Sequence, residues 1–212
     1  KGLMQKLLTG EVRLPGFDSK WSNVKIGNII KEINEKSTVN NQFQVLSVTK
    51  DGIVSQSEHF KKQVASDNNI GYKIIRKNNL VFSTMNLWMG SLDVLTNYEV
   101  GLVSPAYKVF KFNDEVMDPI FGKYFMKTEH MIWLYNVNSE QGASVVRRNL
   151  DLKGLLNTYV NIPSLEEQRN IARVIFCLDT EIDLLEHETK QLIKQKKGLM
   201  QLLLTGKIRV KV

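Results

Sequence analysis

The feature that most constrains the fold is a heptad-like pattern over the last fifty residues. Pro163 and Ser164 stand before it, and Glu167 follows Ser164 at the capping-box spacing of a helix start, while Gly206 is typical of a helix end. The sequence predicts one helix of about 41 residues, roughly 60 Å long and too long for the interior of a small domain. Its spacing of three and four residues predicts a helix-helix interface through Ile171, Ile175, Leu178, Ile182, Leu185, Leu192, Leu199 and Leu203.

The end of this predicted helix is repeated at the start of the chain. Residues 1–10 read KGLMQKLLTG and residues 197–206 read KGLMQLLLTG, and Arg13 occupies the place of Arg209. A repeat at a fixed offset indicates a repeated structural unit. We therefore expect residues 1–13 to be the end of a preceding helix of the same kind, whose start lies outside this chain.

Charge is distributed unevenly along the chain. The net charge is +7, which favours an anionic partner such as nucleic acid. Residues 164–188 carry a net charge of −5, whereas residues 189–212 hold seven basic residues and no acidic one. Antiparallel pairing of two such helices would set acidic segments beside basic ones. We expect a homodimer, or pairing with a second half of the same kind, through antiparallel helices of residues 163–212.

Between the repeats, residues 14–162 predict a mixed domain. The segments FQVLSV, YKIIRK, NLVFST, AYKVFKF and TYVNIP have strand composition, whereas VKIGNIIKEI has helical spacing. Asp118 and Pro119 predict a helix start that continues through Trp133, and Asp151 predicts the cap of a short helix. We expect Trp21 and Trp133 to be core anchors. The predicted class is α+β, with a small twisted sheet followed by the long coiled-coil-forming helix.

Three long polar loops are candidates for binding DNA, because Lys and Arg neutralise phosphates while polar side chains and Arg bond to base edges. Any one of these residues is also explained as an ordinary solvated loop residue, and Trp88 fits a core position equally well. The loop candidates are Thr49, Lys50, Ser55, Gln56, Ser57, Lys61 and Lys62 in the first loop, Ser83, Asn86, Trp88 and Ser91 in the second, and Ser144, Arg147 and Arg148 in the third.

The sequence offers little for catalysis. His59, His130 and His187 lie in different predicted elements, and Cys177 is the only cysteine, so no metal site is expected. Ser104–Tyr107 reads SPAY and lacks the second proline of an adenine methyltransferase motif. Glu188 and Lys190 match the end of a metal-nuclease motif, but they fall on the long helix. No apolar run is long enough to span a membrane, and we expect a cytoplasmic protein.

Several segments together resemble the specificity subunit of type I restriction-modification enzymes. They are IPSLEEQRNIARVIFCLDTEID with the long helix after it, KKGLMQLLLTGKIR, RKNNLVFSTM with its Gly/Ser loop, and GLVSPAYKVF. The resemblance covers nearly the whole chain. It implies a non-catalytic subunit in which each target recognition domain reads half of a split double-stranded DNA target, while antiparallel helices set the spacing. This chain has only one such domain, residues 14–162.

The resemblance also implies partners and cofactors. Methyltransferase and restriction subunits would bind S-adenosylmethionine, ATP and Mg, and this chain would bind no cofactor. Two other interpretations remain open. One is a coiled-coil scaffold whose middle domain binds a protein or ligand, and the other is a recognition domain detached from a fused methyltransferase-nuclease.

Overall fold

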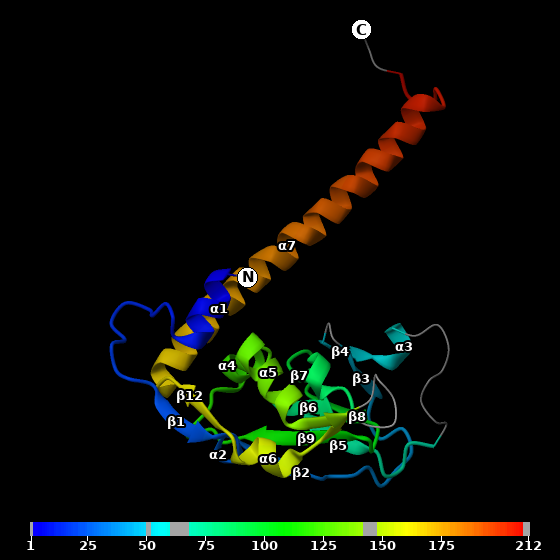
Figure 1. Cartoon of the computed structure of the whole chain (residues 1–212). Helices are drawn as coiled ribbons and strands as arrows, with labels where there is room; N and C mark the ends of the chain where they lie inside the picture. The colour runs from blue at the N-terminus through cyan, green and yellow to red at the C-terminus, as the bar shows by residue number, and fades with distance from the viewer. Residues whose placement is uncertain (1, 50–51, 60–67, 142–147, 210–212) are drawn as a thin grey trace. The chain divides into compact units, whose positions relative to one another are not determined.

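The computed structural model describes residues 2–49, 52–59, 68–141 and 148–209. The chain divides into two compact units, Lys1–Ala172 and Arg173–Val212. The helical elements, labelled in Figure 1 where space allows, are α1 (Gly2–Thr9), α2 (Ile26–Ile29), α3 (Gln56–His59), the 3₁₀ helix η1 (Leu87–Met89), α4 (Pro119–Phe125), α5 (Glu129–Val137), α6 (Leu152–Asn157) and α7 (Leu165–Leu204).

The strands of the first unit pair in several small antiparallel sheets. A four-stranded sheet has the order β2-β9-β6-β7, and β1-β12, β3-β4, β5-β8 and β10-β11 pair in twos. The strands are β1 (Ser22–Lys25), β2 (Ile30–Ile33), β3 (Leu46–Thr49), β4 (Gly52–Ser55), β5 (Lys73–Arg76), β6 (Leu80–Ser83), β7 (Leu92–Val94), β8 (Val100–Val103), β9 (Tyr107–Phe112), β10 (Ser139–Gln141), β11 (Arg148–Leu150) and β12 (Tyr159–Ile162).

The four-stranded sheet buries both of its faces. Because side chains alternate along a strand, Val81 and Val109 point to the face opposite that of Phe82 and Phe110. Val81 and Val109 join a core that also draws buried residues from β3, β4, β5 and β8. The small sheets are therefore held together by one apolar core.

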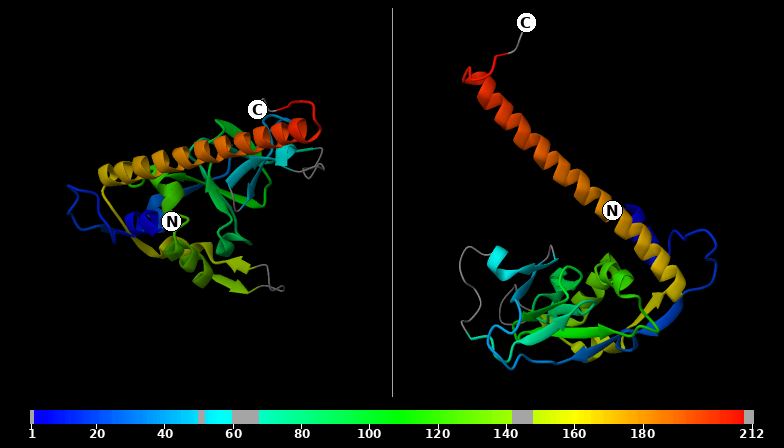
Figure 2. Two further views of the ribbon diagram at one scale, coloured as in Figure 1. Left: turned by 90° about the horizontal axis from the view of Figure 1, so that it is seen from above. Right: turned by 180° about the vertical axis from the view of Figure 1, so that it is seen from behind.

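Helices α4 and α5 lie on the other side of this sheet (Figures 1 and 2). Phe82 and Phe110 stack there with ring centroids 5.1 Å apart. A Cβ atom on Gly122 of α4 would lie 2.7 Å from Phe112, so this position admits only glycine at the present spacing. Close packing of α4 on β9 thus depends on a residue without a side chain.

The mixed α/β class with a long C-terminal helix is confirmed, while two helix predictions were wrong. VKIGNIIKEI forms β1, one turn of helix and β2, because Ile30 begins the strand that pairs with β9. The helix that begins after Asp118 stops at Phe125, and a second begins after Thr128, whose side chain caps it. The break changes the buried face, which leaves Trp133 56% exposed instead of in the core.

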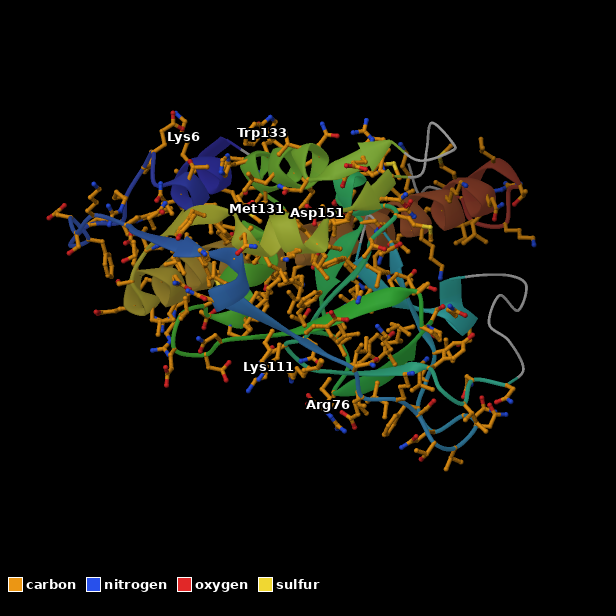
Figure 3. All side chains as sticks on the ribbon, turned by 60° about the horizontal axis from the view of Figure 1, so that its bottom comes forward. Lys6, Arg76, Lys111, Met131, Trp133 and Asp151 are labelled. Atoms are coloured by element: carbon orange, nitrogen blue, oxygen red, sulfur yellow. The ribbon has the colours of Figure 1, made fainter. Side chains whose placement is uncertain are left out.

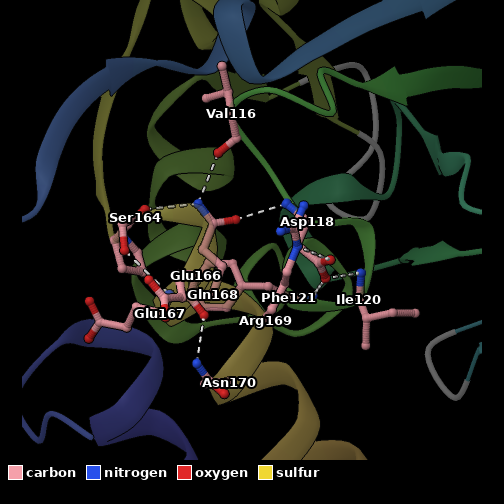
Figure 4. A network of polar contacts seen from close by, with 11 residues as sticks. Val116, Asp118, Ile120, Phe121, Ser164, Glu166, Glu167, Gln168, Arg169 and Asn170 are labelled. Carbon is pink, nitrogen blue, oxygen red and sulfur yellow. Dashed lines mark hydrogen bonds and ion pairs between the residues drawn. The ribbon is translucent and has the colours of Figure 1, made fainter. Parts of the chain in front are cut away.

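The start of α7 is fixed by a buried amide. Ser164 Oγ accepts a hydrogen bond from the backbone N–H of Glu167, as the capping-box spacing predicts. Gln168 is fully buried, and its Nε2 donates to the carbonyls of Val116 and Pro163, both at 2.9 Å. Its Oε1 accepts from the N–H of Asp118 at 2.8 Å (Figure 4). One side chain therefore joins the start of α7 to the segment that enters α4.

The neighbouring Glu167 makes a second long-range contact. Its carboxylate does not close the capping box, because it accepts from Arg13 Nε at 2.6 Å and Arg13 Nη2 at 2.7 Å. The bond to Glu167 raises the pKa of the Arg13 guanidinium. Arg13 also lies over the ring of Trp21, 5.6 Å from its centroid. Residues 13 and 167 are thus joined within the first unit.

The second unit continues α7 to Leu204, so the helix has 40 residues. Among the eight predicted interface residues, Ile171 and Ile175 are buried. The other six are between 42% and 56% exposed: Leu178, Ile182, Leu185, Leu192, Leu199 and Leu203. Their apolar face is available to a partner.

Replacement of Gln168 by Ala should destabilise the first unit by about 3 kcal/mol, because it leaves buried backbone groups without hydrogen bonds. The free energy of unfolding in urea, followed by circular dichroism, would measure the loss. Gln191→Ala on the exposed part of the same helix is the matched control. Equal losses in the two variants would contradict the structural role of Gln168.

Candidate nucleic-acid interface

The first predicted loop is largely regular structure. Thr49 ends β3 and donates from Oγ1 to the Gly52 carbonyl at 2.9 Å, while Ser55 ends β4 and is buried. Ser55 Oγ accepts from Gln44 Nε2 at 2.7 Å and lies 2.8 Å from Ser57 Oγ. These side chains stabilise the hairpin. Ser57 remains exposed at the start of α3.

Gln56, also predicted to contact DNA, bonds within the domain. Its Nε2 donates to Ser47 Oγ at 2.7 Å, which joins α3 to β3. Its Oε1 is buried and has no hydrogen-bond partner among the residues that the structure describes. Lys50, Lys61 and Lys62 lie outside the described residues.

The second predicted loop turns tightly after β6. Ser83 is buried at the end of the strand, and its carbonyl accepts from the N–H of Asn86 at 3.2 Å. The carbonyl of Asn86 accepts in turn from Ser91 at 3.4 Å. Asn86, Trp88 and Ser91 are half-buried. The turn therefore holds Trp88 on η1 in a defined position.

The third predicted loop meets the second through Arg148. Its guanidinium carbon lies over the Trp88 ring, 4.5 Å from the centroid, and its Nη1 donates to Asn136 Oδ1 at the end of α5. Its backbone N–H donates to the Met85 carbonyl at 3.4 Å. Ser144 and Arg147 fall outside the described residues. Of this loop's candidates, Arg148 is the one that the structure places beside Trp88.

Asp93, which was not among the predicted site residues, connects the first loop to the second. This buried residue on β7 accepts from the N–H of Ile53 at 3.3 Å through Oδ2. Its Oδ1 lies 2.7 Å from Nζ of Lys127, in the connection between α4 and α5. A Cβ on Gly52 would lie 3.0 Å from the same carboxylate, at a φ of +130°. An acidic residue next to a turn gives no sequence signal of such a role.

The hairpins of the first and third loops lie at the same end of the first unit. Figure 2 shows β3-β4 and β10-β11 at the end remote from β1 and β12. Trp88 and Arg148 link η1 to β11, and Asp93 links β7 to β4. The described parts of all three predicted loops are therefore connected to one another.

Several cations elsewhere on the first unit are paired with acidic side chains. Arg76 pairs with Glu35 at 2.6 Å, Lys108 with Glu32 at 2.7 Å, and Lys111 with Asp114 at 3.2 Å. Arg76 and Lys111 project from the same side of the molecule in Figure 3. Burial, together with nearby Lys108, lowers the pKa of Lys73. This side offers less uncompensated positive charge than its lysine and arginine content suggests.

The described residues contain no group of three or more His, Cys, Asp and Glu side chains that could hold a metal ion. Within the same residues, no helix is long and apolar enough to cross a membrane. Glu188 and Lys190 lie on α7 and are exposed, as the sequence predicts.

The chain is similar in sequence to specificity subunits of type I restriction enzymes. It is 35% identical to the putative type I restriction enzyme MjaX specificity subunit of Methanocaldococcus jannaschii over 106 residues. The matched region is 48% of this chain and 23% of that relative. It is 47% identical over 57 residues to the MjaVIII specificity subunit of the same organism, which is 27% of this chain and 13% of that protein. The chain thus matches under a quarter of the length of these relatives.

A solved structure has the same fold. The HsdS subunit of Thermoanaerobacter tengcongensis superposes with a TM-score of 0.53 and 16% identity, covering 94% of this chain and 49% of that one. The model of the type I restriction modification DNA specificity domain matches residues 18–195. Because this match includes most of the chain, the protein belongs to the family of type I restriction modification DNA specificity domains.

Proposed function

We propose that this chain is a non-catalytic DNA-recognition subunit that reads one half of a split double-stranded target. The observation that carries the proposal is the family match over residues 18–195, which includes all three polar loops. Their described parts are joined at one end of the domain by Trp88, Arg148 and Asp93. Such loops on a rigid sheet suit base recognition.

Catalysis would belong to other subunits in this proposal. A methyltransferase subunit would supply S-adenosylmethionine, and a restriction subunit would supply ATP and Mg chemistry, while this chain directs both to the target in the cytoplasm. The alternative, a scaffold whose middle domain binds a protein or ligand, has no structural observation that favours it over DNA recognition.

We further infer that the end of α7 docks on the start of an equivalent helix in a second recognition domain. The two copies of the repeat end alike: Gly10 and Gly206 have φ values of +76° and +71°. Val12 N–H donates to the Lys6 carbonyl at 3.1 Å, and Ile208 N–H to the Leu202 carbonyl at 3.2 Å. The shared sequence thus forms the same helix end twice.

The two copies differ in their surroundings. Leu7 and Leu8 are 3% and 1% exposed, whereas the matching Leu203 and Leu204 are 42% and 82% exposed. Arg13 bonds Glu167, whereas Arg209 is exposed and forms no ion pair in the part of the chain that the structure describes. If Leu203 and Leu204 became buried as Leu7 and Leu8 are, each leucine would stabilise the docked state by about 1.5–3 kcal/mol. In this proposed docking the two helices run antiparallel, which agrees with the opposite charges of the two halves of α7.

A selection experiment tests DNA recognition. The chain, assembled with a methyltransferase subunit, should enrich a short shared motif from a library of random duplexes. Its affinity for unselected duplexes should fall as salt rises, because phosphate contacts release counterions. Fluorescence anisotropy would measure the affinities. An absence of enrichment together with salt-independent affinity would contradict DNA recognition and favour the scaffold.

A labelled peptide of residues 197–212 tests the docking of α7. It should bind the full chain once Leu8→Ala and Arg13→Ala weaken the contacts of α1, and an unlabelled peptide of residues 1–16 should displace it. Arg209→Glu in the peptide should weaken binding about tenfold, because the ion pair becomes a repulsion. Anisotropy measures each dissociation constant.

Lys207→Glu in the peptide is the matched control, because Glu11 occupies that place in the first copy. Its charge change equals that of Arg209→Glu, yet binding should stay within about twofold. Equal losses for the two peptides, or no binding by the unmodified peptide, would contradict the docking. Thermal unfolding of the weakened chain establishes that it remains folded.

A further inference from the structure

Lys73 on β5 is a largely buried cation that has no partner in the part of the chain described. The residue is 7% exposed, and within the described residues its side chain forms no hydrogen bond or ion pair. The amine itself reaches the surface, because Nζ is not among the described side-chain nitrogens that are both buried and unpaired. Lys73 therefore buries its aliphatic stem and presents its charge at the surface.

A second lysine, Lys36, lies directly opposite Lys73 in an antiparallel bridge. Backbone hydrogen bonds of 2.9 Å and 2.8 Å flank the pair on its two sides, and among the described residues none joins the two lysines to each other. In such a non-hydrogen-bonded pair the opposed side chains share one face of the sheet and approach more closely than in the other kind of pair. Lys36 is exposed. The backbone therefore holds two lysines side by side on one face.

Lys108 on β9 and Glu32 on β2 lie close to the same amine. Nζ of Lys108 is 2.7 Å from Oε1 of Glu32. Burial and the nearby Lys108 lower the pKa of Lys73, and Glu32 acts in the opposite direction. Lys36 lowers this pKa as well. Because the interaction between charges falls with their separation, Lys36, Lys73 and Lys108 form one lysine cluster.

The lysine cluster has too few carboxylates for its charge. Glu32 is held by Lys108, and Glu35, which follows on the same segment, is held by Arg76 at 2.6 Å. Like charges that lie close together repel, and burial of the Lys73 stem weakens the screening by water. An external anion would remove this repulsion and give Lys73 the partner that the described residues do not supply.

We propose that Lys36, Lys73 and Lys108 bind one phosphate group. A phosphate presents several oxygens, so a single group accepts hydrogen bonds from more than one ammonium group. Its source is either the DNA backbone or a free phosphate, since both offer the same oxygens and charge. The site itself does not depend on the proposed function, whereas its occupation by a DNA phosphate does. In that case the cluster positions the duplex and does not read its bases.

Lys73→Met tests the site, because methionine keeps an unbranched apolar stem and removes the charge. The variant should unfold at no lower temperature than the unmodified chain, since a costly unpaired charge is lost. Inorganic phosphate should raise the unfolding temperature of the unmodified chain, because a ligand of the folded state stabilises it. Most of this rise should be absent in Lys73→Met. Calorimetry measures both, with sodium chloride of equal ionic strength as the reference.

Lys31→Met is the matched control. Lys31 is exposed on β2 directly before Glu32, so alternation along the strand places it on the opposite face. The control removes the same charge from a neighbouring strand and should keep the full response to phosphate. Equal losses of the response in Lys31→Met and Lys73→Met would show an effect of overall charge and would overturn the site.

A labelled duplex distinguishes the two sources of the phosphate. If the DNA backbone supplies it, Lys73→Met should weaken duplex binding about fivefold, and equally for different sequences. The slope of log affinity against log salt should also fall by about one. If duplex affinity is unchanged while the response to inorganic phosphate is lost, the cluster binds a free phosphate. Fluorescence anisotropy measures the affinities in the assembly with the methyltransferase subunit.

Failure of the site and failure of the proposed function give different results. If Lys73→Met responds to phosphate and binds the duplex as the unmodified chain does, the phosphate site is wrong although DNA recognition stands. If the unmodified chain binds no duplex in any assembly, yet its response to phosphate requires Lys73, the proposed function fails and the phosphate site stands.

Discussion

The structure depends on two consecutive buried polar residues at the start of α7, Glu167 and Gln168. A buried carboxylate and a buried amide are stable only where the surrounding chain supplies their hydrogen bonds. Arg13 supplies them for Glu167, and the backbone at Val116, Asp118 and Pro163 supplies them for Gln168. The start of the long helix is consequently fixed to two distant segments of the first unit, at Arg13 and at Val116–Asp118.

The same principle separates the two arginine-tryptophan pairs. At Arg13 the protein provides its own anion, so the site is complete within the fold. At Arg148 it provides a ring and a neutral amide, and two donors remain unpaired among the described residues. The two contacts have similar geometry, but within the described residues only at Arg13 does the fold itself supply a charged acceptor for the guanidinium.

Much of the fold could be predicted from local pattern. The cap at Asp118, the cap at Asp151 and the long helix after Ser164 were correct, because each depends on residues within a few positions. Helix and strand periods are harder to distinguish in short segments: Ile26–Ile29 does form one helical turn, but Ile30–Ile33 was assigned wrongly. There, pairing of Ile30 with Phe112 outweighs helical spacing.

The candidate site was only partly predictable. Polar loops are visible in the sequence, and Trp88 and Arg148 were both identified, but nothing local shows that they stack on each other. Asn136, Asp93 and Lys127 were missed because their roles exist only once β7, β11 and the α4-α5 connection lie together. Among the polar candidates, Ser55 and Gln56 form hydrogen bonds within the domain, which their residue types do not reveal.

The sequence by itself determined the long amphipathic helix, the repeated helix end, the opposite charges of the two halves of α7 and the family. These follow from periodicity, identity and charge, which act along the chain. Only the tertiary structure decided which arginine is neutralised, which glutamine is buried and which tryptophan is exposed. Burial and pairing depend on segments far apart in sequence, such as residues 13 and 167, whose contact arises from packing.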